Sequence, residues 1–130
     1  MADYFSDSYN IYTAENGEIG VEMANRLQPE VIISDIMMPV MDGLTLCKKV
    51  KESPRSSYIG IILLTAKSLE SQKVEGIRTG ADVYLTKPFD IELLEAHLNH
   101  LIARKKELTN YFRTELINQQ EPPKKENNQD

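Results

Sequence analysis

Short apolar runs alternate with segments of helical periodicity along the chain. The runs at 10–13, 31–34, 59–64 and 82–85 are rich in β-branched and aliphatic residues, and the second and third are apolar almost throughout. Continuous apolar runs of this length are typical of strands that are buried on both faces. The pattern therefore predicts four strands.

Apolar residues between and after these runs recur at intervals of three or four, which is the period of an amphipathic helix. They predict helices over 17–27, 44–51 and 69–78, and a last helix that begins after Asp90 and reaches Ile117. The alternation of strands and helices indicates an α/β fold with a parallel sheet and helices on its faces.

Composition narrows the class of protein. A length of 130 residues suits a single domain, and a net charge of −5 is a poor match for nucleic acid. No apolar run approaches the roughly 18 residues of a membrane span, so we expect a cytoplasmic protein that contacts neither membrane nor nucleic acid. The single cysteine, Cys47, cannot form an internal disulfide, and we expect it to pack in a helix.

Polar side chains follow the second, third and fourth expected strands. They are Asp35, Thr65 and Lys87. Parallel strands end at one edge of a sheet, where ligands bind in open α/β folds. Each residue alone has an ordinary explanation as a turn, a helix cap or a solvated side chain. Together they suit a phosphoryl group, which the carboxylate attacks while the ammonium and the hydroxyl bind its oxygens.

The segments around these residues resemble the response-regulator receiver domains of bacterial two-component systems, in order and in spacing. The matching motifs are Asp35-Ile36-Met37-Met38-Pro39, Asp42-Gly43, Leu64-Thr65-Ala66 and Gly80-Ala81-Asp82-Val83-Tyr84-Leu85-Thr86-Lys87-Pro88-Phe89. The resemblance covers roughly residues 2 to 105 and implies a flavodoxin-like, doubly wound parallel sheet.

The resemblance also implies the roles of individual residues. Asp35 would accept a phosphoryl group from a histidine kinase, and Lys87 would contact that group. Thr65 and Tyr84 would form a switch pair that changes a partner-binding face. The peptide bond between Lys87 and Pro88 would be cis, which only a following proline makes plausible.

A magnesium ion is the cofactor that the resemblance implies, held by Asp35 and by the backbone carbonyl of Met37. In that family an acidic pair after the first strand also binds the metal, but only 34 residues precede Asp35 here. We therefore expect the first strand and the start of the first helix to be missing, and magnesium affinity to be reduced. Asp3 and Asp7 are expected to be solvated helix residues.

The last helix is longer than a small sheet can cover. We expect a receiver domain over 1–106, a helical extension over 107–118 and a disordered tail or linker over 119–130. Such an arrangement resembles receivers cut from a hybrid sensor kinase or an AraC-type regulator. The expected partners are accordingly a histidine kinase and an output domain or partner protein.

Without the first strand, the strand at 31–34 has an exposed apolar edge and the strand at 10–13 has no neighbour. Such an edge tends to pair with another chain. We expect homo-oligomerisation through this edge or through the last helix, in preference to collapse of the 10–13 strand onto the 31–34 strand.

The residues around Asp35 also bear on two other functions. The lack of the acidic pair leaves open a receiver-like module that binds partners through its Tyr84 face without being phosphorylated. Haloacid-dehalogenase-like phosphatases require a second aspartate two positions after the nucleophile, where this chain has Met37, so we expect no enzyme. His97 and His100 lack a third ligand nearby in the sequence and are expected to be exposed helix residues.

Overall fold

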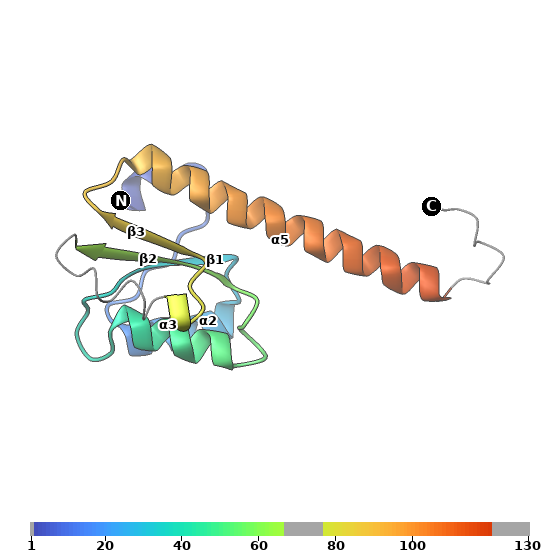
Figure 1. Cartoon of the computed structure of the whole chain (residues 1–130), viewed down its shortest axis with the longest axis horizontal. Helices are drawn as coiled ribbons and strands as arrows, with labels where there is room; N and C mark the ends of the chain where they lie inside the picture. Colours follow the sequence, from blue (N-terminus) through green and yellow to red (C-terminus); the bar gives the residue numbers. More distant parts are fainter. Residues whose placement is uncertain (1, 67–76, 121–130) are drawn as a thin grey trace.

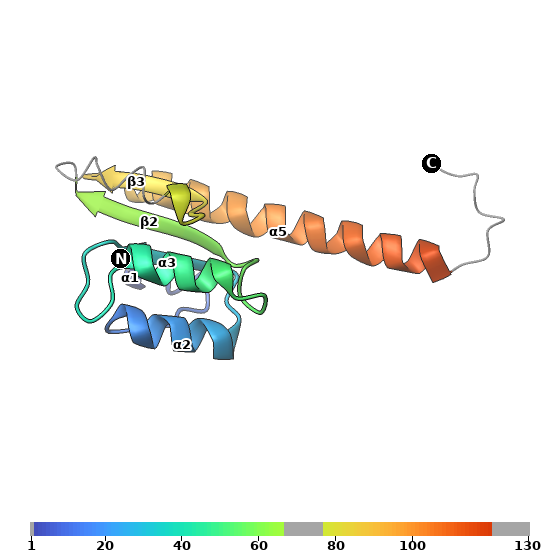
Figure 2. The same cartoon turned by 60° about the horizontal axis from the view of Figure 1, so that its bottom comes forward.

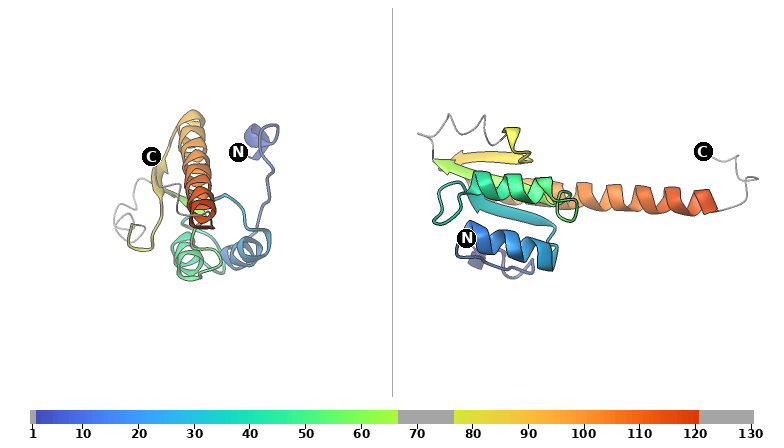
Figure 3. Two further views of the ribbon diagram at one scale, coloured as in Figure 1. Left: turned by 90° about the vertical axis from the view of Figure 1, so that its right-hand side faces the viewer. Right: turned by 90° about the horizontal axis from the view of Figure 1, so that it is seen from below.

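A parallel three-stranded sheet lies between two layers of helices (Figure 1). The computed structural model describes residues 2–66 and 77–120. In chain order the elements are α1 (Ala2–Phe5), α2 (Gly17–Leu27), β1 (Val31–Asp35), α3 (Gly43–Glu52), β2 (Gly60–Ala66), β3 (Val83–Lys87) and α5 (Ile91–Gln120). α1 and α5 lie on one face of the sheet, and α2 and α3 lie side by side on the other (Figures 2 and 3). The α/β fold with a parallel sheet is confirmed.

The strand order is β1-β2-β3, and both ladders are parallel. Leu64 pairs with Asp35 on one side and with Leu85 on the other. Ala66, two residues further along β2, pairs with Lys87. This register places the ends of all three strands at one edge of the sheet.

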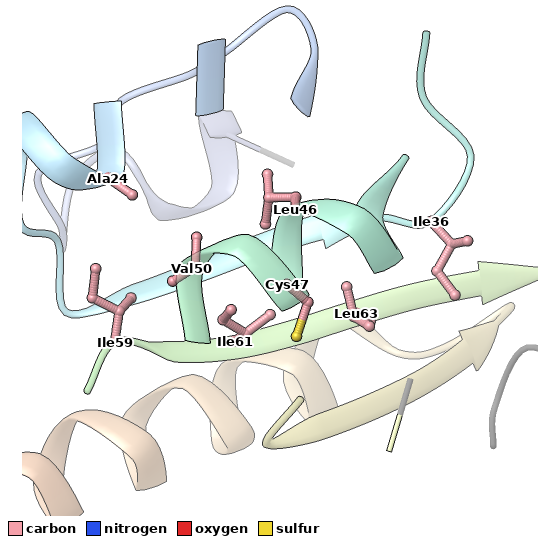
Figure 4. Close-up of a cluster of buried hydrophobic side chains, with 8 residues drawn as sticks. All are labelled: Ala24, Ile36, Leu46, Cys47, Val50, Ile59, Ile61 and Leu63. Carbon is pink, nitrogen blue, oxygen red and sulfur yellow. The ribbon is translucent and has the colours of Figure 1, made fainter. Parts of the chain in front are cut away.

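One hydrophobic core fills the space between the sheet and the α2–α3 layer (Figure 4). Its buried members are Ala24, Ile36, Leu46, Cys47, Val50, Ile59, Ile61 and Leu63. The Cys47 thiol donates a hydrogen bond to the Thr79 carbonyl over 3.5 Å, and burial raises its pKa. Cys47 is therefore a packing residue whose thiol stays protonated, as its helical context predicted.

A second core joins the opposite face of the sheet to α1 and α5. Its buried members are Phe5, Ile62, Leu64, Leu85, Leu94, Leu98 and Leu101. The Tyr9 hydroxyl donates to Asn99 over 2.5 Å, and the Tyr4 hydroxyl donates to Glu95 over 3.1 Å. These bonds hold the N-terminal segment against α5, although Tyr4 itself is exposed.

The expected strand over 10–13 is wrong. The segment has no regular secondary structure and forms no ladder, and Ile11 and Tyr12 are both exposed. Across residues 2–66 and 77–120, no strand pairs with the outer edge of β1. A strand is stabilised by hydrogen bonds to a neighbour, so local β-propensity alone does not make one here.

The helices follow the sequence closely. α2 has the predicted bounds, and α3 is one residue longer at each end. Most of the helix expected over 69–78 lies outside the described residues, and Gly80, which follows it, has a left-handed φ of 93°. α5 continues through Gln120, two residues past the expected extension. In the described ranges, no helix has both the length and the apolarity to cross a bilayer.

Gly43 joins the first turn of α3 to the end of β1. A Cβ added here would lie 2.3 Å from the backbone oxygen of Asp35. The Gly43 amide also donates to the Ile36 carbonyl over 2.8 Å, and the Asp42 side chain caps the helix by accepting from the Thr45 amide. The absence of a side chain at 43 therefore lets α3 begin directly beside Asp35.

We expect Gly43→Ala to lower the free energy of unfolding by about 2 kcal/mol, because the added methyl group overlaps backbone that cannot move aside easily. Urea denaturation followed by circular dichroism measures this change. Gly20→Ala is the control, since its added Cβ would meet side-chain atoms rather than backbone: the Leu46 Cδ1 atom at 2.9 Å and the Ala14 Cβ atom at 3.9 Å. The expectation is wrong if both variants unfold at the same urea concentration as the unmodified chain.

Candidate functional site

The carboxylate of Asp35 and the ammonium of Lys87 form an ion pair at the carboxyl edge of the sheet. The Lys87 Nζ atom lies 2.5 Å from the Asp35 Oδ1 atom. β2 lies between the two strands, and its small Ala66 occupies the position beside Lys87. The lysine side chain therefore reaches back across the end of β2 to the carboxylate.

The pair is only partly shielded from water. The Asp35 side chain is 47% exposed and that of Lys87 is 49% exposed, so the pair contributes at most about 1 kcal/mol to stability. The Oδ1 atom, which the Lys87 ammonium approaches, is covered from solvent. The exposed surface of Asp35 lies on the rest of its carboxyl group, where an incoming group can approach.

Thr65 lies at the same edge of the sheet as Asp35 and Lys87, but its side chain is on the opposite face of the sheet from theirs. Side chains alternate along a strand, so Thr65 continues the row of Ile61 and Leu63, which faces α3. It is buried, and its hydroxyl donates to the Ala66 carbonyl over 3.3 Å. In the described part of the chain, no hydrogen bond joins Thr65 to Asp35 or Lys87.

Tyr84 lies on the α3-facing side of β3. It is directly opposite Leu63 in the ladder and is partly buried against the first core. Thr65 is two residues beyond Leu63 on the same face, so Thr65 and Tyr84 are diagonal neighbours across the two strands.

The loop after β1 contains a feature that the sequence did not reveal. Val40 has a left-handed φ of 68°, which a β-branched residue rarely adopts, and its side chain is exposed. Met37 is also exposed, whereas Met38 packs against the first core and lies within 3.7 Å of the Ser34 hydroxyl. In the sequence, only Pro39 and Gly43 indicated an irregular loop here.

The residues around Asp35 offer few ligands for a metal ion. Over residues 2–66 and 77–120, no three His, Cys, Asp or Glu side chains come together as a metal site. The Asp42 carboxylate caps α3, and the predicted solvated residues Asp3 and Asp7 are exposed. Among the described residues this leaves the Asp35 carboxylate and the Met37 carbonyl as protein ligands, and water would complete the octahedral shell that Mg²⁺ requires.

The sequence of this chain matches the family model of the response regulator receiver domain over residues 2–99. A histidine kinase of Formosa agariphila is 39% identical over 104 residues, which are 80% of this chain and 8% of that protein. The DNA-binding dual master transcriptional regulator RpaA of Synechocystis is 36% identical over 112 residues, which are 85% of this chain and 46% of that protein.

The fold also matches that of a receiver domain of known structure. The receiver domain of a sensor histidine kinase from Pseudomonas aeruginosa superposes with a TM-score of 0.70 at 27% identity, covering 78% of this chain and 84% of that one. That structure has a magnesium ion coordinated in its active site cleft. The present chain spans less than half the length of the two curated relatives named above.

Proposed function

Because the chain belongs to the response regulator receiver family, we propose that Asp35 is the residue that becomes phosphorylated. The chain is a phosphoacceptor domain of two-component signal transduction. The observation that supports Asp35 as the acceptor is its ion pair with Lys87 at the carboxyl edge of the sheet. The pair combines a nucleophilic carboxylate with a cation that can bind the transferred group.

The proposed reaction is a phosphoryl transfer. An oxygen of Asp35 attacks phosphorus in a phosphohistidine, the phosphorus–nitrogen bond breaks, and the histidine leaves with its electron pair. The product carries nearly two negative charges, of which Lys87 balances one. The Thr65 hydroxyl would then leave the Ala66 carbonyl and donate to a phosphoryl oxygen.

The same movement would connect the site to a partner-binding face. Thr65 is a diagonal neighbour of Tyr84 on the α3-facing side of the sheet. When Thr65 moves to the phosphoryl group, Tyr84 can turn into the space that it leaves. The proposed switch is therefore a change in side-chain packing that a local charge triggers.

Receiver domains bind Mg²⁺, as the relative from Pseudomonas aeruginosa illustrates. In this chain Asp35 and the Met37 carbonyl would hold such an ion, which would balance the remaining negative charge. Since Asp35 supplies a single carboxylate, which is already paired with Lys87, we propose weak metal binding. The proposed phosphoryl transfer and the proposed switch use only side chains of this chain.

The proposed partners are a histidine kinase, an output domain or partner protein, and a second copy of the chain. We also propose a cytoplasmic location and no direct contact between this segment and nucleic acid. Catalytic turnover of phosphate esters is not part of the proposal, because the general acid of a haloacid-dehalogenase-like phosphatase is replaced by Met37, whose side chain is exposed.

The alternative function is a receiver-like module that binds partners without being phosphorylated. The shortage of metal ligands around Asp35 favours it, because metal assists phosphoryl transfer by neutralising developing charge. In that case the Tyr84 face would bind its partner in a single conformation.

We expect acetyl phosphate with magnesium to label the chain weakly, and only at Asp35, because the metal is poorly held. Intact-mass measurement and peptide mapping detect the label. Asp35→Asn should remove it, whereas Asp42→Asn, the control, should retain it. A label that survives Asp35→Asn contradicts the assignment, and a complete lack of label at high magnesium supports the alternative function.

We expect Lys87→Ala to slow labelling about tenfold, which corresponds to about 1.4 kcal/mol. Two unit charges about 4 Å apart near a protein surface interact by roughly 4 kcal/mol, and the exposure of Lys87 reduces this value. Lys49→Ala removes the same charge from an exposed position on α3 and should leave the labelling rate unchanged. Equal rates for the two variants would show that Lys87 does not contact the transferred group.

A further inference from the structure

The second half of α5 extends away from the domain (Figures 1 and 2). At 30 residues, the helix is about 45 Å long. Leu94, Leu98 and Leu101 on its first half are buried against the sheet. Further along, the Lys105 ammonium lies 4.5 Å from the centroid of the Tyr58 ring, and this contact marks where the helix leaves the domain.

An apolar stripe continues along the projecting half. Leu108 follows Leu101 by seven residues, and Phe112 follows by another four, so both lie on the side of the helix that is buried within the domain. The exposed fractions are 49% for Leu108, 59% for Tyr111 and 60% for Phe112. A helix that stands alone in solvent is usually polar all round, so this stripe indicates that something packs against it.

The charges beside the stripe distinguish between possible partners. Lys105, Leu108, Phe112 and Glu115 follow one another at intervals of three, four and three, which is the spacing of a coiled-coil seam. Parallel pairing with a second copy would place Lys105 against Lys105 and Glu115 against Glu115. Antiparallel pairing, centred between Leu108 and Phe112, would place Lys105 against Glu115 and Leu108 against Phe112.

We propose that two copies of this chain associate through antiparallel pairing of residues 105–115 of α5. The seam contains two layers in which Leu108 packs against Phe112 of the second copy. An ion pair between Lys105 and Glu115 closes each end, and Tyr58 limits the seam where the helix meets the domain. The two domains then lie at opposite ends of the paired segment.

This arrangement depends on the register as well as on hydrophobicity. A charged residue at a seam position weakens pairing wherever it meets a like charge, and so it selects one orientation. Lys105 can make a contact in both the monomer and the dimer, because its long side chain can turn from the Tyr58 ring to the Glu115 carboxylate of the second copy. The short seam predicts reversible association that depends on protein concentration.

Sedimentation velocity on the complete chain over a range of concentrations tests the proposal. We expect a monomer–dimer equilibrium that Leu108→Ser with Phe112→Ser abolishes. Both residues are exposed in the single chain, so the double variant should unfold at the same temperature at low concentration. Leu93→Ser is the control, because Leu93 is equally exposed on α5 but lies outside the seam.

Charge reversal tests the orientation. Lys105→Glu should raise the dimer dissociation constant about tenfold, since two carboxylates then meet at each end of the seam. Combining it with Glu115→Lys should restore the original value, because the opposite charges again face each other. Parallel pairing predicts no such recovery, since either arrangement keeps like charges together.

Three outcomes would overturn the proposal. One is a chain that stays monomeric up to high micromolar concentration. Another is a dimer that persists in the Leu108→Ser, Phe112→Ser variant, which would point to the outer edge of β1. The third is a dimer that charge reversal weakens and the combined exchange does not restore.

Discussion

The burial of β2 on both faces and both edges is the constraint on which the rest of the structure depends. Its residues from Ile61 to Thr65 are all buried, and it forms a parallel ladder with β1 on one side and β3 on the other. The register of each ladder is determined by the side chains of the neighbouring strand that pack into the two cores. A shift of either neighbour by one residue would turn its apolar row toward the wrong layer. The meeting of Asp35 and Lys87 is thus a consequence of core packing rather than of their mutual attraction.

The weakness of that ion pair fits the proposed function. A half-exposed pair contributes at most about 1 kcal/mol, so little free energy is lost when the ammonium moves to a new anion. A buried pair would resist separation far more strongly, because each charge would be left without solvent. The end of β1 is held by its ladder with β2 and by the hydrogen bond from the Gly43 amide to the Ile36 carbonyl. The backbone is therefore fixed while the charged groups remain available.

The sequence predicted α2 with its bounds, the parallel sheet and the three polar residues at the strand ends, because periodicity and strand termini are local signals. It failed at 10–13, where Ile11 and Tyr12 have strand propensity but find no neighbour, since pairing is not local. Thr65 lies at the same edge as Asp35 and Lys87, as predicted, but it continues the row of side chains on the opposite face of the sheet. Which face Thr65 takes depends on the register with β1 and β3, which the sequence of β2 alone does not contain.

The placement of these residues links the site to both helical layers. Asp35 and Lys87 continue the strand rows that include Ile33 and Leu85, and these rows pack in the second core with α5. Thr65 and Tyr84 continue the rows that pack in the first core with α3. A new charge at the sheet edge would therefore act on two cores through separate sets of side chains. Since α5 carries its apolar stripe from the second core past the domain, the helix that would respond to the charge is also the helix that can contact another chain.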